Sequence, residues 1–366
     1  MAAFGMNTVA PQQDTPITGF SDSISSVVFK QTGQAGQPVQ GPEFLAAGSW
    51  DNSVRVFQIS AGGPAGPIQA VPGPVNSTHK APVLCVAFGP RNSPIENQVF
   101  SGSCDNTFCQ WDYVSQRTIP VASAHQSPIS CISGAMLGGS SPAIATAGWD
   151  KFLKYWDVRQ PPTAPAIQVM LPERAYCMDV KEHLLTVGLA DGSVNIYNLN
   201  SPNQPMKTTR TKLTAQLRDI KIWPDLNGFC VGSIEGRVSV EFFQEPKPNS
   251  SFTFKCHRED VMPGQKHQGQ RVFPVNALAF NHTGTFATGG ADGVICFWDK
   301  LNRRKLKQLP KLPAPSCVSA LCFNSSSTLL AYANSYDWHK GHQFHNSSAQ
   351  NSLFIHRIIP GEISSR

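Results

Sequence analysis

The sequence has no Cys-x-x-Cys pair, although it contains 10 cysteines in 366 residues. The spacing that is typical of zinc ribbons and dithiol redox sites is therefore missing, and we expect neither a metal nor another cofactor. Cys85, Cys131, Cys177, Cys317 and Cys322 lie inside apolar runs, which is typical of small buried side chains. This cysteine usage predicts a reduced, intracellular setting.

Other signatures are missing as well. No apolar run approaches the roughly 18 residues of a membrane span, and no signal peptide is recognisable, so we expect no membrane insertion. Neither a Gly-x-x-x-x-Gly-Lys phosphate loop nor a Gly-x-Ser-x-Gly elbow occurs, and we expect no catalytic residues. Charged residues make up 15% of the chain and the net charge is +6, which permits an acidic partner without identifying one.

A short motif recurs along the chain, consisting of a glycine turn, an acid and an alternating run that often ends in Trp-Asp. The clearest copy, AGWDKFLKYWDVR, spans residues 147–159. The seven turn acids are Asp51, Asp105, Asp150, Asp191, Glu235, Asp292 and Asp337. They are 41 to 57 residues apart, which fits a WD repeat of about 40 to 45 residues with loop insertions. Seven copies of four short strands predict an all-β, seven-bladed WD-repeat β-propeller.

The motif residues are those that a tight turn between strands requires. Asn or Gly after the acid supplies the positive φ, and a short acid bonds nearby backbone. In the copies at Asp105, Asp150 and Asp292 a tryptophan follows six residues later. Two copies add an upstream histidine and a hydroxyl: His79 with Ser101, and His125 with Thr146. The WD-repeat resemblance implies hydrogen-bonded Asp-His-Ser/Thr-Trp sets there, and their repetition disfavours a serine-hydrolase triad.

The two ends of the chain suggest how the ring closes. We expect residues 1–14 to form a disordered tail, residues 15–358 the propeller and residues 359–366 a C-terminal tail. Only nine residues follow Arg357, which leaves no strand there for the last blade. We therefore expect the segment 16–20 to pair with the final blade and to remove the exposed edges.

The residue before each turn acid is expected on one face, near the centre of the ring. Three of these seven positions hold a large aromatic residue: Trp50, Trp149 and Tyr336. Exposed aromatic residues gathered on a rim are typical of binding hot spots, an interpretation that we favour over packing onto a neighbouring blade. Arg237, two residues after Glu235, suggests pairing with a carboxylate of a peptide, although alone it would be a solvated surface charge.

A second anomaly is the basic stretch WDKLNRRKLKQLPK at 298–311. It contains six basic residues against one acid, Asp299. The six are Lys300, Arg303, Arg304, Lys305, Lys307 and Lys311. They are equally compatible with an outer strand protected from edge pairing and with a groove for single-stranded nucleic acid. In the second interpretation the groove would include four residues of the preceding blade: Phe254, Lys255, His257 and Arg258.

The segment HKGH places His339 and His342 three residues apart. No acid accompanies these histidines in the segment, which is polar, so we interpret it as a loop rather than a metal site. A metal-dependent hydrolase that uses His339, His342 and neighbouring acids is the enzymatic alternative.

Seven segments together resemble the WD-repeat mRNA export factors of the nuclear pore. They are GSWDNSVRVF, AGWDKFLKYWDVR, LPERAYCMDV, GSIEGRVSVEFF, FTFKCHR, FWDKLNRRKLK and SYDWHKGH. The likeness covers about residues 20–357. A related propeller of the spindle checkpoint shares GSIEGRV and FKCHR, whereas SYDWHKGH, LPERAYC and WDKLNRRKLK favour the export factors.

The resemblance implies a non-enzymatic binding platform in nuclear mRNA export, found in the nucleus at the nuclear pore complex and shuttling to the cytoplasm. Its implied partners are a short segment of an FG nucleoporin, lying across one propeller face, and single-stranded RNA or an mRNA ribonucleoprotein. The alternative is a mitotic spindle-checkpoint scaffold that binds the same class of motif in kinetochore proteins and other checkpoint proteins.

The resemblance also assigns residues to the two partners. For the peptide it implies Trp50, Trp149, Arg237 and Lys255, to which we add Tyr336 from the aromatic rim. For RNA it implies Phe254, Trp298, Lys300, Arg303 and Lys305, to which we add Arg304 and Lys307 from the basic stretch.

Overall fold

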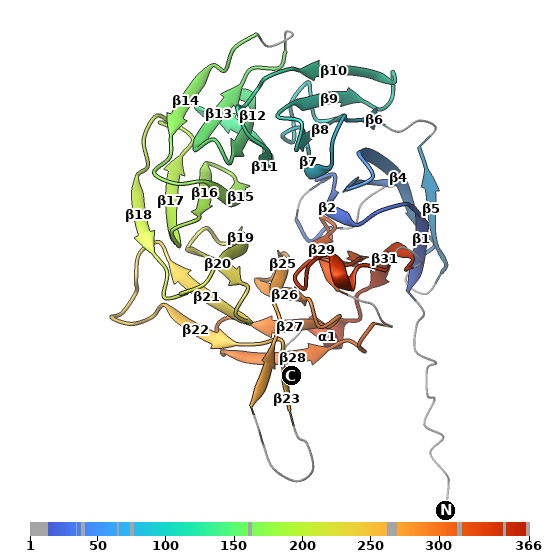
Figure 1. Cartoon of the computed structure of the whole chain (residues 1–366), viewed down its shortest axis with the longest axis vertical. Coiled ribbons are helices and arrows are strands. Elements are labelled where there is room, and N and C mark those ends of the chain that lie inside the picture. Colours follow the sequence, from blue (N-terminus) through green and yellow to red (C-terminus); the bar gives the residue numbers. More distant parts are fainter. Residues whose placement is uncertain are drawn as a thin grey trace, which may run out of the picture.

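Seven β-sheets are arranged around a common centre as the blades of a ring in the computed structural model (Figure 1). The structure describes residues 14–33, 35–37, 41–63, 66–73, 77–159, 163–261, 269–312, 317–346 and 349–363. Within these residues the regular elements are strands, apart from a short 3-10 helix, η1 (His342–Phe344), and one helical turn, α1 (Pro360–Ile363). The predicted all-β, seven-bladed propeller is confirmed.

Each blade is an antiparallel sheet, and its strands follow one another in order from the centre of the ring to the outside. The innermost strands are β2 (Ile24–Phe29), β7 (Val83–Phe88), β11 (Ile129–Leu137), β15 (Ala175–Lys181), β19 (Leu217–Ile222), β25 (Val275–Phe280) and β29 (Val318–Phe323). The second strands are β3 (Glu43–Ser49), β8 (Gln98–Ser103), β12 (Ser141–Gly148), β16 (Leu184–Leu189), β20 (Gly228–Ser233), β26 (Thr285–Gly290) and β30 (Leu329–Asn334). We number the blades 1 to 7 in this order.

The third and outermost strands complete the blades. The third strands are β4 (Ser53–Ala61), β9 (Phe108–Asp112), β13 (Phe152–Trp156), β17 (Ser193–Asn198), β21 (Arg237–Phe242), β27 (Ile295–Asp299) and β31 (Asn351–Arg357). The outermost strands are β5 (Ile68–Pro72), β10 (Arg117–Val121), β14 (Ile167–Met170), β18 (Lys207–Arg210), β22 (Phe252–Lys255), β28 (Arg304–Gln308) and, in blade 7, β1 (Thr15–Phe20). A short strand, β6 (Ser77–Thr78), also pairs with β4.

The strand β1 closes the ring, as predicted. It pairs antiparallel with β31, placing Ile17 opposite Leu353. Ile17 and Phe20 point into the core shared by blades 7 and 1. The last blade therefore consists of strands from both ends of the chain, and its outer edge is formed by β1.

Hydroxyl and amide groups on the innermost strands link neighbouring blades. Ser25 donates a hydrogen bond to the Val83 carbonyl, and Ser319 donates one to the Ile24 carbonyl at the closure. Asn276 makes the same kind of contact with the Val318 carbonyl. These bonds satisfy backbone carbonyls next to the centre of the ring and fix the spacing of the blades.

The polar insertion before blade 6 contains two further strands. They are β23 (Arg258–Asp260) and β24 (Gln270–Val272), which form a hairpin that projects from the ring in Figure 1. Residues 262–268 lie outside the described residues. None of the helices in the described part of the chain is long and apolar enough to cross a membrane.

The ends of the chain meet at His356. Of the predicted tail 1–14 only Asp14 is described, and the division into tails and propeller remains a prediction. His356 Nδ1 lies 2.7 Å from Asp14 Oδ1, and its Nε2 lies 3.0 Å from Glu362 Oε2 on α1. Tyr332 donates a hydrogen bond to the other oxygen of Asp14. The imidazole therefore connects the start of β1, the strand β31 and the C-terminal turn.

This connection makes stability depend on pH. Burial alone lowers the pKa of His356, but the hydrogen bonds to Asp14 and Glu362 outweigh it and raise the pKa from 6.5 to about 9. Because the folded-state pKa is raised, the stabilisation is fully present below about pH 6.5 and is lost as the pH rises through about 9. It amounts to about 3 kcal/mol at about 1.4 kcal/mol per pKa unit.

We expect the stability advantage of the wild type over a His356→Gln variant to shrink as the pH rises from 6 to 9.5. Urea unfolding followed by circular dichroism at several pH values measures it. An advantage that stays constant over this range would contradict the role of the charged imidazole.

Candidate binding surfaces

The turns between the second and third strands of all blades lie on one face of the ring, which we call the turn face. The reason is that every sheet is antiparallel and the blades repeat by rotation about the centre. One backbone hydrogen bond marks the same position in each turn. Its donors are the amides of Trp50, Cys104, Trp149, Ala190, Ile234, Ala291 and Ser335, and its acceptors are the carbonyls of the residues preceding the innermost strands.

Trp50 and Trp149 are both exposed on the turn face, as predicted. Their exposed fractions are 37% and 40%, which is high for tryptophan in a folded chain. Ile234, which occupies the same position in blade 5, is 39% exposed. The turn face therefore presents large apolar groups in blades 1, 3 and 5.

The expected place of Tyr336 is wrong by one residue. In blade 7 the marker hydrogen bond is donated by Ser335 to the Cys317 carbonyl, so Ser335 takes the position that Trp50 holds in blade 1. Tyr336 is only 8% exposed, and its hydroxyl donates to the Gly341 carbonyl. The acid of blade 7, Asp337, therefore comes one residue later than in the other turns. Tyr336 is buried beneath the turn and bonds the loop at Gly341.

An aromatic stack next to Trp50 was not predicted. The ring of Trp338 lies 6.0 Å from that of Trp50 and 4.9 Å from that of His345, with interplanar angles of 23° and 12°. Trp338 has a φ of 61°, in the left-handed region that tryptophan rarely adopts. In this conformation the Trp338 ring of blade 7 stacks on the Trp50 ring of blade 1, so the two rings connect these blades.

The turn of blade 5 carries a cluster of cations. Arg237 and Lys255 are paired across β21 and β22, and Arg237 Nε lies 3.8 Å from Glu235 Oε2. Arg258 donates to the Glu235 carbonyl. Among the described residues, the Nε atoms of Arg237 and Arg258 are buried without a hydrogen-bond partner.

A cavity of about 470 Å³ opens between the turn of blade 4 and the segment 210–216 that leads into blade 5. Its lining includes Tyr176, Asp191 and Lys212. Because it lies between Trp149 in blade 3 and Arg237 in blade 5, the exposed tryptophan, the cavity and the cation cluster follow one another around the turn face.

The predicted contacts of histidine with acid and hydroxyl are present in blades 2 and 3, and in blade 3 Trp156 completes the set by donating to Thr146 Oγ1 at 2.9 Å, a bond that Trp111 does not make to Ser101 in the described part of blade 2. His79 Nε2 lies 2.7 Å from Ser101 Oγ and its Nδ1 lies 3.2 Å from Asp105 Oδ2. Burial is the largest effect on the imidazole and lowers the pKa of His79, although Asp105 acts in the opposite direction. His125 Nε2 lies 2.8 Å from Thr146 Oγ1, and its Nδ1 lies 2.9 Å from Asp150 Oδ1.

A third set, in blade 6, was missed. His257 Nδ1 lies 2.9 Å from Asp292 Oδ1, and its Nε2 lies 2.8 Å from Thr288 Oγ1. Trp298 donates to the same hydroxyl at 3.0 Å. His257 is buried, so its expected place in a nucleic-acid groove is wrong. The missed signal was the spacing of Thr288 and Trp298 around Asp292, which repeats that of blade 3.

Aromatic and cationic side chains of β22 in blade 5 and of blade 6, the next blade around the ring (Figure 1), contact one another. The ring of Phe254 lies 4.6 Å from that of Trp298. The guanidinium of Arg303 lies 4.3 Å above the ring of Phe252. Lys305 is opposite Trp298 in the register of β27 and β28. We call these five residues the blade 5–6 surface; Phe252 was not predicted.

The basic stretch divides into exposed and buried cations. Arg303, Arg304, Lys305 and Lys307 are exposed. Lys300, predicted among them, is buried: its Nζ lies 3.0 Å from Asp225 Oδ2 and 4.0 Å from the centre of the Trp223 ring. Burial raises the pKa of Asp225, but the hydrogen bond and charge of Lys300 outweigh it and hold that pKa below its usual value. Lys300 therefore anchors the turn that carries Arg303.

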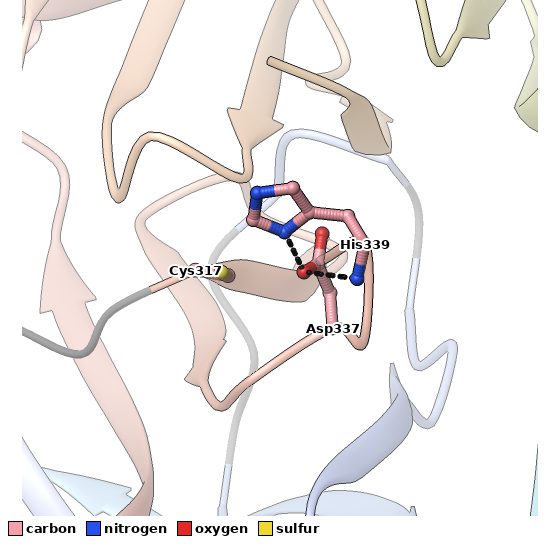
Figure 2. Close-up of side chains that lie close together, drawn as sticks. All are labelled: Cys317, Asp337 and His339. Atoms are coloured by element: carbon pink, nitrogen blue, oxygen red, sulfur yellow. Dashed lines mark hydrogen bonds and ion pairs between the residues drawn. The ribbon is translucent and has the colours of Figure 1, made fainter. Parts of the chain in front are cut away.

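Cys317, Asp337 and His339 form a cluster in blade 7 (Figure 2). One potential ligand atom from each lies within 4.8 Å of the other two. His339 Nδ1 is within hydrogen-bond distance of Asp337 Oδ1. The expectation that no acid accompanies the HKGH histidines is therefore wrong for His339.

Comparisons with known proteins agree with this architecture. The family model "WD domain, G-beta repeat" matches residues 12–58, 73–112, 116–157 and 263–299. The chain is 36% identical over 346 residues to the poly(A)+ RNA export protein of Schizosaccharomyces pombe, covering 94% of this chain and 90% of that protein. It is 35% identical to Protein Rae1 of Drosophila melanogaster, covering 91% and 90% of the two chains. It is 36% identical to the mRNA export factor of Danio rerio, covering 94% and 89%.

A solved structure supports the fold alone. It is described as "Structure of U3-55K" and superposes with a TM-score of 0.71 at 16% identity, covering 94% of this chain and 98% of that chain.

Proposed function

Because the chain belongs to the WD-repeat family of mRNA export factors, we propose that it acts in nuclear mRNA export as a non-enzymatic binding platform. The turn face binds a short segment of an FG nucleoporin, and the blade 5–6 surface contacts single-stranded RNA within an mRNA ribonucleoprotein. We propose that the protein resides in the nucleus and at the nuclear pore complex and passes to the cytoplasm together with its cargo, and its similarity to mRNA export proteins supports this proposal.

The observation that carries the proposal is the cation cluster at the turn of blade 5. The Arg237 side chain is 36% exposed and lies beside the exposed Ile234, and Arg258 of the same cluster is half-buried. An acidic side chain of a bound segment would satisfy both the charge and the hydrogen-bonding capacity. Lys255, paired with Arg237 across the strands, adds a further cation.

The peptide-binding site extends from this cluster around the turn face. Trp149 in blade 3 and Trp50 in blade 1 supply exposed rings that apolar side chains of the segment cover. Tyr336 holds the loop that carries Gly341 and so supports the stack beside Trp50. A segment bound in this way contacts blades 1, 3 and 5, so no single blade accounts for its affinity.

The RNA-contacting site uses a different part of the ring. Phe254, Trp298 and Phe252 are half-buried and offer ring surface on which bases stack. The phosphates are held by the exposed cations of β28 and of the turn before it: Arg303, Arg304, Lys305 and Lys307. Lys300 takes part by positioning this turn and leaves the phosphate contacts to its neighbours.

We expect an Arg237→Glu variant to lose binding to FG nucleoporins, because the new carboxylate repels an acidic segment and removes the guanidinium. The measurement is affinity purification from nuclear extract with wild type and variant, followed by immunoblotting for FG nucleoporins. Lys181→Glu, the same charge reversal at an innermost strand, is the matched control, and the variants are compared by thermal unfolding.

Two outcomes would overturn the proposal. FG nucleoporins recovered equally with the wild type and Arg237→Glu would remove the cation cluster from the site. Recovery of checkpoint kinases in place of nucleoporins would favour the mitotic scaffold.

A further inference from the structure

The cluster of Cys317, Asp337 and His339 brings three kinds of metal ligand together from two separate segments. Cys317 ends the loop that enters blade 7, whereas Asp337 and His339 belong to the turn after β30. Figure 2 shows the carboxylate of Asp337 next to the imidazole of His339, with the thiol of Cys317 nearby. All three side chains are largely withdrawn from solvent, with exposed fractions of 2% for the Asp337 side chain and 16% for that of His339.

In other blades the same two segments are joined by a histidine. In blades 2, 3 and 6 a histidine from the entering loop contacts the acid of the turn: His79, His125 and His257. In blade 7 the entering loop supplies a thiol, and the turn supplies both the acid and the histidine. A metal ion coordinated by all three would restore the link between loop and turn.

The geometry suits a small tetrahedral ion. Ligand atoms of tetrahedral zinc are about 3.3 to 3.6 Å apart, since Zn–S is about 2.3 Å and Zn–N and Zn–O are about 2.0 Å. The three atoms here lie within 4.8 Å of one another, so zinc binding requires the thiol to approach by about 1 Å and His339 Nδ1 and Asp337 Oδ1, now in hydrogen-bond contact, to move apart by a similar amount. Sulfur and imidazole ligands select zinc over magnesium or calcium.

A neighbouring blade orients the carboxylate. Asn276, on the innermost strand of blade 6, donates a hydrogen bond of 2.6 Å to Asp337 Oδ2. This bond leaves Oδ1 directed at His339, whose backbone amide and Nδ1 it contacts, and a bound ion would replace the contact with Nδ1. Outer contacts of this kind orient ligands in known metal sites and strengthen binding.

We propose that Cys317, Asp337 and His339 bind one Zn²⁺ ion per chain and thereby fasten the entering loop of blade 7 to its turn. Water completes the coordination, and the thiol releases its proton to solvent when the ion binds. The inference does not depend on the proposed function, because it concerns a link within one blade.

Zinc binding at this place also fixes the aromatic stack. Trp338 lies between two ligands in the chain, and its ring packs on Trp50 and His345 while its neighbours point toward the ion. Its left-handed backbone allows consecutive side chains to diverge in this way. We therefore expect zinc to alter the fluorescence of Trp338.

The test uses the full chain, freed of any affinity tag and stripped with a chelator. We expect mass spectrometry of the reloaded protein to find about one zinc per chain. Co²⁺ in place of zinc should give a thiolate-to-cobalt charge-transfer band, which requires sulfur ligation. Both Cys317→Ser and His339→Gln are expected to lower the affinity for zinc at least tenfold and to weaken or remove the cobalt band.

Two matched variants serve as controls. Cys104→Ser removes a thiol from a turn of another blade, and His342→Gln removes the second histidine of the HKGH segment; both should bind zinc as the wild type does. His339→Gln keeps the test valid if Cys317→Ser fails to fold. Zinc content far below one per chain, or an affinity unchanged by His339→Gln, would overturn the site.

Discussion

Replacing Ile17 with aspartate is expected to lower the free energy of unfolding by several kcal/mol and to open the ring. Ile17 is buried in the core that blades 7 and 1 share. An unpaired carboxylate at this position would lose its hydration without gaining a partner, at a cost of about 3 to 5 kcal/mol. Since domains are stable by only about 5 to 15 kcal/mol, this is a large part of the total.

The loss reaches beyond one side chain because β1 is the outermost strand of blade 7 and covers the edge of β31. Detachment of β1 would expose the edge of β31 and separate Asp14 from His356. An exposed strand edge favours pairing with other chains. We therefore expect Ile17→Asp to show a lower urea midpoint in circular dichroism together with larger species in size-exclusion chromatography.

The matched control is Thr18→Asp, which places the same charge on the adjacent, exposed side of β1. It should retain a stability near that of the wild type. Equal urea midpoints for the two variants would show that β1 contributes little to closure.

The number of blades and the closure were predictable because they depend on a pattern that recurs. The turn acids count the blades, and the apolar segment before the first blade supplies the strand that completes the last one. The place of Trp50 and Trp149 on the turn face follows from their position in that pattern, since every turn of this type lies on the same face. The residue types at the turns and the spacing of the repeats are therefore sufficient to predict the number of blades and the face on which the turns lie.

The details of blade 7 were not predictable in this way. Its copy of the motif is degenerate, and aligning Asp337 with the other acids shifts the blade by one residue. Only the hydrogen bond from Ser335 to the Cys317 carbonyl reveals the true position. The nearness of Cys317 to Asp337 likewise arises from folding, because the two residues belong to segments separated by two strands.

Contacts between blades explain the remaining differences. His257 is 35 residues from Asp292, whereas the corresponding distances in blades 2 and 3 are 26 and 25 residues, because the insertion with β23 and β24 intervenes. Lys300 belongs to a run of cations in the sequence, yet Asp225 and Trp223 of the preceding blade bury it. A charge run shows where cations are concentrated, but partners distant in the chain determine which of them face solvent.

Reversing the charge of Arg303 and Lys305 together is expected to lower the affinity for single-stranded RNA at least tenfold. Both side chains are exposed on the blade 5–6 surface, and each can neutralise a phosphate. Each phosphate contact releases counterions, so the slope of log affinity against log salt should fall by about 0.7 per contact, or about 1.4 for the pair. Fluorescence anisotropy with a labelled oligouridylate at several salt concentrations measures both quantities.

A second substitution separates stacking from charge. Phe254→Ala removes ring surface next to Trp298 and keeps every cation. Because base stacking on an aromatic side chain is worth about 1 to 3 kcal/mol, the affinity should fall by about fivefold or more while the salt slope is unchanged. Thermal unfolding of this variant shows whether the fold is retained, since Phe254 also packs against the core.

The control for charge is the pair Lys80→Glu and Arg117→Glu on blade 2, which changes the net charge by the same amount at two other exposed positions. If binding were due to the overall positive charge of the protein, both double variants would weaken it equally. If the blade 5–6 surface binds RNA, only the Arg303 and Lys305 pair lowers the slope. Equal losses in the two variants would contradict a defined RNA site, because non-specific attraction depends on net charge rather than on where the cations lie.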